Sequence, residues 1–386
     1  MRITIVQGAF LPVPPLLGGA VEKVWFNLGK EFARRGHQVV HLSRAFRELP
    51  DQEVIEGVRH ERVSGFPSPA TFARRTALDL WYGLRIMPRL PAADILVTNT
   101  FWLPALERRR SRGRRYVHVA RYPKGQLKLY RPAILQTVSE PIRQAILAED
   151  PTAQDRVRVI PYPLANRYLL PSVSPGQNVL LYTGRVHPEK GVHLLIQAFA
   201  RLSPAERGDW RLKLVGPWEV AYGGGGDSYL SELRQAAASL GDRVEFVGRI
   251  FDETKLIEHY AAAKLFVYPS LAEKGETFGL SVLEAMAAGC CPLVSALGCF
   301  RDFIHPGVNG QVFDHRAADP AEELAQTLRR AIADPVVTNQ LRHRAWQDAR
   351  GYTTDVVATR FLDDFASLVS NGGRGAPATT HLSASS

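Results

Sequence analysis

The sequence predicts an α/β protein of two doubly wound, Rossmann-like domains that face a central cleft. Short apolar runs alternate with segments of helical periodicity along almost the whole chain, as in parallel strands joined by helices. This alternation is interrupted once, by a proline-rich stretch between residues 161 and 175. The length of 386 residues also favours two domains, because a single hydrophobic core stops growing at about 250–300 residues.

The first alternating series opens with a strand at residues 3–6 and a helix from about residue 20 to residue 35. Large apolar residues recur at helical spacing in this helix, and Gly36 ends it. The later runs are apolar throughout, which is typical of parallel strands buried on both faces. Strands are therefore expected at residues 38–42, 95–98, 116–119, 134–138 and 157–160.

A second alternating series follows the proline-rich stretch. Its expected strands lie at residues 179–182, 212–215, 244–247, 265–268 and 292–295, with helices at 192–202, 256–263, 338–349 and 356–369. Ligands of open α/β sheets bind at the carboxyl ends of the strands, so the cleft is the expected site. We predict an N-terminal domain at residues 1–165, a C-terminal domain at 175–350, a final helix at 351–370 and a disordered tail at 371–386.

The formal net charge is +10, and many of the positive charges lie in one short run. The run lacks the interleaved aromatic residues, zinc-finger spacing or recognition helix of a nucleic-acid site, so no nucleic-acid partner is expected. A solvated loop is the favoured interpretation, and peripheral contact with a membrane surface or an anionic acceptor is the alternative. The run consists of Arg108, Arg109, Arg110, Arg112, Arg114 and Arg115.

The three cysteines, Cys290, Cys291 and Cys299, cannot all pair, and reduced buried thiols are expected. The chain opens on a strand pattern rather than a signal peptide, and no apolar window is long enough for a membrane span. These features predict a cytoplasmic protein with at most peripheral contact at the inner face of the membrane. The histidines show no metal-ligand spacing, so no metal site and no further cofactor are expected.

The strongest chemical signal is a pair of carboxylates, Glu276 and Glu284, at the two ends of a loop-to-helix junction. Eight residues of helix span about 12 Å, too far for both acids to act on one bond. Between them lie the backbone amides of Phe278, Gly279 and Leu280. A glycine at a helix N-terminus lets a phosphate approach closely and favours its charge. The pattern therefore fits an extended ligand with a central phosphate; two surface glutamates are the alternative.

A second signal, at residues 184–191, follows the strand expected at 179–182 and precedes a helix. It places Arg185 and Lys190 at the carboxyl end of a strand. Arginine forms bidentate bonds to phosphate and lysine adds a compact charge, so both would stabilise a diphosphate leaving group. The motif is not a Walker loop, and a solvated turn is the alternative.

These motifs resemble glycosyltransferase family 4. The resemblance rests on GR-x4-KG, on the two glutamates in EKGETFGLSVLEAMAAG, and on the opening GG-x-VEKVWFNLGKEFARRGHQVV, and it spans Met1 to about Phe365. It implies the GT-B fold, a last helix that crosses back to the N-terminal domain, and transfer from a nucleotide diphosphate sugar with retention of anomeric configuration. The motif distinguishes the family but not its members.

The resemblance also implies a role for each motif residue. Arg185 and Lys190 would hold the diphosphate, Glu276 the hydroxyls of the donor sugar, and Glu284 the ribose. The nucleotide-sugar site implied by the resemblance comprises Gly18, Gly19, Arg185, Lys190, Arg249, Ile250, Glu276, Phe278, Gly279, Leu280 and Glu284.

His118 follows the strand residues Tyr116 and Val117, near the end of an expected N-terminal strand, where the family often places a histidine that lines the reaction centre. A neutral histidine would bond a donor hydroxyl or orient the acceptor, and a structural histidine is the alternative. The predicted catalytic set is Glu276, His118, Arg185 and Lys190. Arg121 and Lys124 are acceptor or phosphate candidates, or merely solubilise a loop.

The predicted function is retaining transfer of a hexosyl or N-acetylhexosaminyl group from a nucleotide diphosphate sugar, with UDP favoured, to an acceptor hydroxyl. The acceptor is a lipid-linked sugar, a polysaccharide or a small natural product; the sequence does not choose among them. Another GT-B enzyme, such as an epimerase or a phosphorylase, is one alternative. A non-catalytic nucleotide-sugar-binding or scaffold protein is the other.

Overall fold

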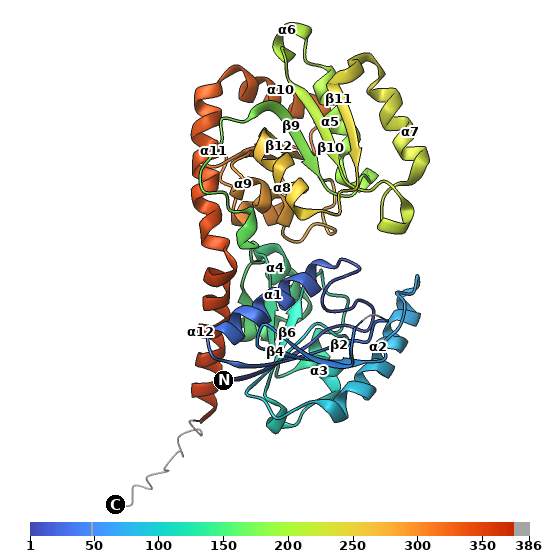
Figure 1. Ribbon diagram of the computed structural model, residues 1–386, viewed down its shortest axis with the longest axis vertical. Helices are drawn as coiled ribbons and strands as arrows, with labels where there is room; N and C mark the ends of the chain where they lie inside the picture. Colours follow the sequence, from blue (N-terminus) through green and yellow to red (C-terminus); the bar gives the residue numbers. More distant parts are fainter. Residues whose placement is uncertain (48, 374–386) are drawn as a thin grey trace, which may run out of the picture.

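Two separate β-sheets make up the framework of the computed structural model, which describes residues 1–47 and 49–373 (Figure 1). The first sheet ends with β8 (Val157–Val159), and the second begins with β9 (Gln177–Thr183). The change of sheet therefore falls in the proline-rich stretch. The helix expected at residues 351–370 extends to Gly373 as α12 (Thr354–Gly373), so it includes the start of the expected tail. The remainder of that tail lies outside the described residues.

The first sheet has eight strands in the order β3-β4-β2-β1-β5-β6-β7-β8. Neighbouring strands are parallel except β3 and β4, which form an antiparallel hairpin at one edge. The hairpin turns at Glu56 and Gly57, whose φ angles are 46° and 82°. No apolar run marks this hairpin, and it was not predicted. The strands before β8 are β1 (Arg2–Val6), β2 (Gln38–Arg44), β3 (Gln52–Ile55), β4 (Val58–Val63), β5 (Ile95–Thr98), β6 (Arg114–Val119) and β7 (Ile134–Thr137).

Helices cover both faces of this sheet. The helix α1 (Ala20–Arg34) joins β1 to β2 and buries Trp25 and Phe32 on one face. The later connections, from β4 to β5 and onwards to β8, run across the sheet in the direction opposite to the β1–β2 connection. Because such connections are right-handed, their helices lie on the opposite face. These helices are α2 (Phe72–Ile86), α3 (Leu103–Leu106) and α4 (Glu140–Glu149).

Two histidines form a buried pair on the α1 face. His41 of β2 and His60 of β4 are register partners, and their stacked rings lie 5.2 Å apart. Within residues 1–47 and 49–373, none of their ring nitrogens has a hydrogen-bond partner. Burial lowers the pKa of His60 to about 4 and that of His41 well below its usual value. Both rings are therefore neutral at pH 7.

The second sheet has six parallel strands in the order β11-β10-β9-β12-β13-β14. Five of them lie within two residues of their predicted positions, and the short β14 was not predicted. All three cysteines are buried and unpaired. The other strands are β10 (Arg211–Val215), β11 (Val244–Gly248), β12 (Ala263–Tyr268), β13 (Cys291–Ser295) and β14 (Gln311–Phe313). The helices are α5 (Val192–Ala200), α6 (Pro204–Arg207), α7 (Gly226–Ala236), α8 (Glu253–Ala262), α9 (Leu280–Ala287), α10 (Pro320–Ala333) and α11 (Pro335–Ala349).

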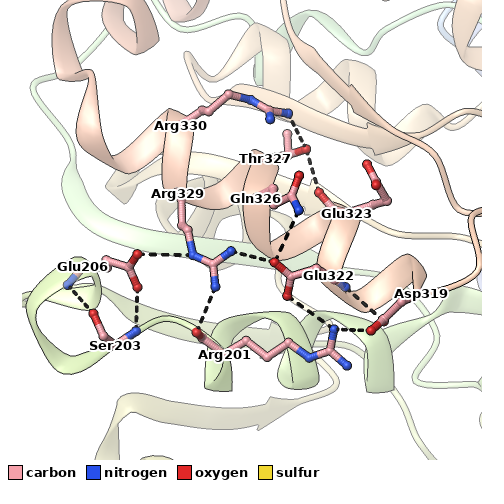
Figure 2. Close-up of polar contacts among 10 residues, drawn as sticks. All are labelled: Arg201, Ser203, Glu206, Asp319, Glu322, Glu323, Gln326, Thr327, Arg329 and Arg330. Carbon is pink, nitrogen blue, oxygen red and sulfur yellow. Dashed lines mark hydrogen bonds and ion pairs between the residues drawn. The ribbon is translucent and has the colours of Figure 1, made fainter.

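A polar network ties α10 to the turn between α5 and α6 (Figure 2). Arg329 pairs with Glu322 of its own helix at 2.8 Å and reaches Glu206 of α6 at 3.3 Å. Glu206 also completes a capping box with Ser203 at the start of α6. Because these ion pairs are largely exposed, we expect them to fix the register of α6 more than to add stability.

The last helix, α12, returns to the N-terminal sheet, as the resemblance implies (Figure 1). Its Phe361 and Phe365 pack against Trp25, Phe32 and Tyr116 of the first domain. The two chain crossings between the domains also bond to each other, since the N–H of Leu164 donates to the carbonyl of Tyr352 at 2.6 Å. The domains are thus joined by two adjacent segments.

Among residues 1–47 and 49–373, no helix is long and apolar enough to cross a membrane.

Candidate active site

Two neighbouring strands of the second sheet position the strongest motifs. β9 leads into the loop with Arg185 and Lys190, and the adjacent parallel β12 leads into the loop with Glu276. The loops touch at Gly191, where φ is 68° and a Cβ atom would lie 2.0 Å from the carbonyl oxygen of Pro269. Glycine is required there because any side chain would push the loops apart.

Lys190 and Glu276 form an ion pair between these loops. The Lys190 Nζ lies 2.7 Å from Glu276 Oε2, and only 8% and 11% of the two side chains are exposed. The hydroxyl of Tyr268, the last residue of β12, donates to the same carboxylate oxygen at 3.0 Å. A buried cation and a buried carboxylate are thereby held together at the carboxyl ends of two strands.

Arg185 lies at the mouth of the same site with its side chain half-exposed. Its guanidinium donates to Glu189 Oε1 at 2.7 Å and to the carbonyl of Gly223 at 2.9 Å. The Gly223 contact links Arg185 to the glycine-rich loop before α7. Within this motif, Lys190 is fixed by burial, whereas Arg185 keeps donors accessible to solvent.

The N-terminus of α9 lies directly after Glu276. Gly279 caps the helix in the left-handed conformation, with φ 90°, and no side chain caps it. A Cβ atom at Gly279 would lie 2.4 Å from the ring of Phe300, so the glycine lets the chain pass close to this ring. In the part of the chain that the structure describes, the N–H groups of Phe278, Gly279 and Leu280 make no backbone hydrogen bond. They are therefore available to an anion.

Glu284 lies on α9 at the interface with the first domain. Its Oε2 accepts a hydrogen bond from Tyr260 at 3.2 Å, and Tyr260 also contacts Thr183 at 2.5 Å. Burial raises the pKa of Glu284 to about 7, and the positive charge of Lys23 opposes that rise. Lys23 comes from α1 and pairs with Glu253 at 2.5 Å. The carboxyl of Glu284 thus lies within the electrostatic influence of a lysine of the opposite domain, which itself pairs with Glu253.

The start of α1 forms the N-terminal wall. Gly18 and Gly19 have φ angles of 80° and 104°, and Gly19 precedes the first residue of the helix. A Cβ atom at Gly19 would lie 2.3 Å from Glu22 Oε2. Burial raises the pKa of Glu22, and the charge of Arg121 opposes this. Gly19 therefore leaves room for a buried acid that has Arg121 as its nearby cation.

His118 is buried below this wall. Its Nδ1 lies 2.5 Å from Gln136 Oε1, its Nε2 lies 3.4 Å from the Tyr162 hydroxyl, and Trp25 packs edge-on against its ring. Burial lowers the pKa of His118 to about 4, so the ring is neutral at pH 7. Its contacts are those of the structural histidine considered above. Direct contact with a substrate would require these partners to give way, and a catalytic role stays a prediction.

The other predicted residues lie apart from this centre. Arg249 stacks between the rings of Tyr222 and Phe251, at 3.7 and 4.0 Å from their centroids, whereas Ile250 packs against the core. Lys124 lies 5.0 Å from the ring of Phe72 on α2. Of the two acceptor candidates, Arg121 is therefore the one associated with the cleft wall.

The motifs do not reveal several residues that build the site. Tyr268 and Tyr260 bond the two glutamates, Tyr162 joins His118 to Phe278, and Lys23 reaches across the domains. Tyr268 is the last residue of β12, the strand before the Glu276 motif. The carboxyl end of a parallel strand is where ligands bind, so this residue could have been predicted from the sequence. The others come together only through the tertiary fold. Among the described residues, no group of three or more metal-ligating side chains occurs.

Comparison with solved structures identifies the architecture. The structure of sucrose-phosphate synthase from Thermosynechococcus elongatus is similar with a TM-score of 0.77 and 21% identity, over 96% of this chain and 100% of that one. The structure of HepE from Anabaena in complex with UDP has a TM-score of 0.72 and 19% identity, over 95% and 100%. The chain has the GT-B fold.

The chain is also similar in sequence to one family model and to several curated glycosyltransferases. Residues 171–351 match the family model described as glycosyl transferases group 1. The D-inositol 3-phosphate glycosyltransferase 1 of Catenulispora acidiphila is 35% identical over 52% of this chain and 46% of its own length. The lipopolysaccharide 1,2-N-acetylglucosaminetransferase of Salmonella typhimurium is 31% identical over 49% and 48%. An uncharacterized glycosyltransferase of Methanocaldococcus jannaschii is 26% identical over 80% and 84%.

The chain thus matches less than half the length of the first two relatives. The names of these relatives, together with the family match, support glycosyl transfer as the class of reaction.

Proposed function

We propose that this protein is a retaining glycosyltransferase of family 4. It transfers a hexosyl or N-acetylhexosaminyl group from a nucleotide diphosphate sugar to an acceptor hydroxyl. UDP is the favoured nucleotide, and the structural neighbour HepE is described in complex with UDP and with UDP-glucose. The acceptor is a lipid-linked sugar, a polysaccharide or a small natural product.

One observation carries the proposal: a cation, free backbone amides and two carboxylates follow one another around the N-terminus of α9. Lys190 and the amides of Gly279 and Leu280 suit a diphosphate, because they combine a buried positive charge with unused donors. Glu276 on one side suits sugar hydroxyls, and Glu284 on the other suits a ribose. Arg185, accessible at the mouth, adds a second cation, so the proposal includes no metal ion or other cofactor.

The proposed chemistry is a front-face displacement. The acceptor oxygen bonds to the anomeric carbon while the bond from that carbon to the phosphate oxygen breaks. The acceptor proton passes to the leaving phosphate oxygen, so no enzymatic nucleophile is needed. Lys190 and Arg185 stabilise the charge that develops on the diphosphate. A product of inverted anomeric configuration, seen by NMR, would exclude this mechanism.

On the N-terminal side, we propose that Gly18 and Gly19 face the diphosphate and that Arg121 contacts the acceptor. His118, although predicted to be catalytic, lies behind Tyr162, so its proposed role is to orient this hydroxyl. Arg249 and Ile250 are the proposed contacts of the nucleotide base, with the exposed ring of Phe251 beside them.

The test is a thermal-shift panel of UDP-, GDP-, ADP- and dTDP-sugars with the wild type, Arg185→Ala and Glu276→Ala. A ligand at a hundredfold excess over its Kd stabilises the fold by about 2.7 kcal/mol. We expect one nucleotide family to stabilise the wild type, and each variant to lose most of the shift relative to its own melting temperature without ligand.

Arg211→Ala and Glu245→Ala are matched controls, because both residues are exposed at the far side of the same sheet. Their ligand shifts should equal that of the wild type. If no nucleotide sugar shifts the wild type at saturation, the donor site is wrong. A shift without turnover on any acceptor favours a non-catalytic binding protein, and release of free sugar phosphate without nucleotide indicates a phosphorylase.

A further inference from the structure

The positive charge of this protein is concentrated in one segment of the N-terminal domain. Residues 70–131 contain fourteen Lys and Arg residues against three acids. The whole chain has 48 basic and 38 acidic residues, so the remainder has 34 and 35 and is close to neutral. The net charge of +10 is therefore a property of one region rather than of the whole surface.

The three acids of this segment do not offset its surface charge. Asp79 is buried and accepts the N–H groups of Phe101 and Trp102 at 2.9 and 3.0 Å. Glu107 is buried and pairs with Arg109, and Asp94 pairs with Arg2. By contrast, Arg74, Arg85, Arg108, Arg110, Lys124 and Lys128 are exposed, and none of them forms an ion pair with any described residue.

The outer face of α2 adds apolar side chains to these charges. Arg74, Ala77, Trp81, Leu84 and Arg85 are all exposed and recur at spacings that place them on one side of the helix. Trp81 and Leu84 are 61% and 49% exposed. The opposite side of α2 packs Tyr82 and Ile86 onto the sheet. An exposed tryptophan between arginines, with no acid on that face, is atypical of a simply solvated helix.

The position of α2 leaves this face accessible. The crossovers through α2, α3 and the segment that follows β6 all lie on the same side of the first sheet, away from α1 and α12. Figure 1 shows α2 and α12 on opposite flanks of the N-terminal domain. Further apolar residues on the same side, Leu106 and Leu129, are 38% and 48% exposed. A flat partner can therefore meet α2 and the arginine run without contacting the second domain.

We propose that this side of the N-terminal domain, with the outer face of α2 at its centre, docks onto the surface of a lipid bilayer rich in anionic headgroups. Trp81 and Leu84 enter the headgroup region, and Arg74, Arg85, Arg108 and Arg110 pair with lipid phosphates. Tryptophan is favoured at this depth because its ring is amphipathic. The docking surface is independent of the donor site and of the proposed reaction.

The experiment is co-sedimentation of the whole chain with phosphatidylcholine vesicles that contain roughly one third phosphatidylglycerol, and with pure phosphatidylcholine vesicles. We expect binding to the anionic vesicles, weakened by salt, and none to the neutral ones. The variant Arg74→Gln/Arg85→Gln should bind many-fold more weakly, at about fivefold for each charge removed. Trp81→Ser/Leu84→Ser should abolish detectable binding.

The control Val336→Ser/Arg344→Gln replaces one exposed apolar residue and one exposed arginine on α11, away from the proposed surface. It should bind as the wild type does. Brominated lipids should quench tryptophan fluorescence in the wild type but not in Trp81→Phe, which shows directly that this ring is inserted. No binding to anionic vesicles, or binding unchanged in the α2 variants, overturns the proposal. Displacement of bound vesicles by single-stranded DNA at stoichiometric amounts would show a nucleic-acid surface instead. No substrate is present, so the result does not depend on the transferase proposal.

Discussion

Separating Lys190 from Glu276 should destabilise the C-terminal domain strongly, whereas removing both charges should not. At 2.7 Å and an effective dielectric constant of about 20, their attraction is about 6 kcal/mol. Much of this attraction only offsets the free energy that the two charged groups lose when they leave water, since only about a tenth of each side chain is exposed. If one partner is neutralised, the other charge stays buried without compensation, which costs about 3–5 kcal/mol.

The perturbations are Lys190→Met, Glu276→Gln and the double variant, each measured by urea unfolding with circular dichroism. In both single variants the side chain at position 276 still accepts a hydrogen bond from Tyr268. We therefore expect each to lose unfolding free energy near the lower end of this range, about 3 kcal/mol. The double variant should lose only about 1 kcal/mol. Single losses that simply add in the double variant would refute the coupling. The same cycle on the exposed pair Arg211 and Asp242 should give no more than about 0.5 kcal/mol.

Three further predictions concern the loops, the buried histidines and the surface network. Gly191→Ala should cost at least about 2 kcal/mol in urea unfolding, because a steric clash adds to the left-handed φ, whereas Gly208→Ala, with positive φ but open space, should cost about 1 kcal/mol. As the pH falls from about 6.5 towards 4, the buried His41 and His60 should each lower the free energy of unfolding by about 1.4 kcal/mol per pH unit, because the unfolded chain binds protons that the two folded rings do not; replacing both by Val should remove this contribution from the measured pH dependence. Arg329→Ala should lower the free energy of unfolding by less than about 1 kcal/mol, measured in the same way, and a larger loss would contradict a mainly positional role for the network in Figure 2.

The parts of the fold that the sequence predicts are those with a one-dimensional signature. The strands around Ile95 and Leu265 are short and apolar throughout, so both their position and their parallel pairing follow from the pattern. The hairpin of β3 and β4 lacks this signature, because polar and charged residues make up much of both of its strands at the sheet edge. The last helix, expected at residues 351–370, is displaced by three residues from α12 at both ends, since helix ends depend on local capping that periodicity does not record.

The site shows the same division. Motif spacing brings Arg185, Lys190 and Glu276 to one edge of the sheet, and the structure places them there. Motif spacing does not show that Lys190 and Glu276 are paired, that the charge of Lys23 acts on Glu284, or that side chains from three separate segments of the chain enclose His118. Those contacts join residues far apart along the chain, so only the packed structure reveals them.

The return of α12 has a consequence for the order in which this protein is made. Phe361 and Phe365 complete the core beside Trp25 and Tyr116, yet a ribosome adds them after the entire second sheet. While that sheet is being synthesised, the α1 side of the emerging first domain stays uncovered. The domain translated first is therefore finished last, and a premature stop before α12 would leave an exposed aromatic surface on an otherwise complete pair of sheets.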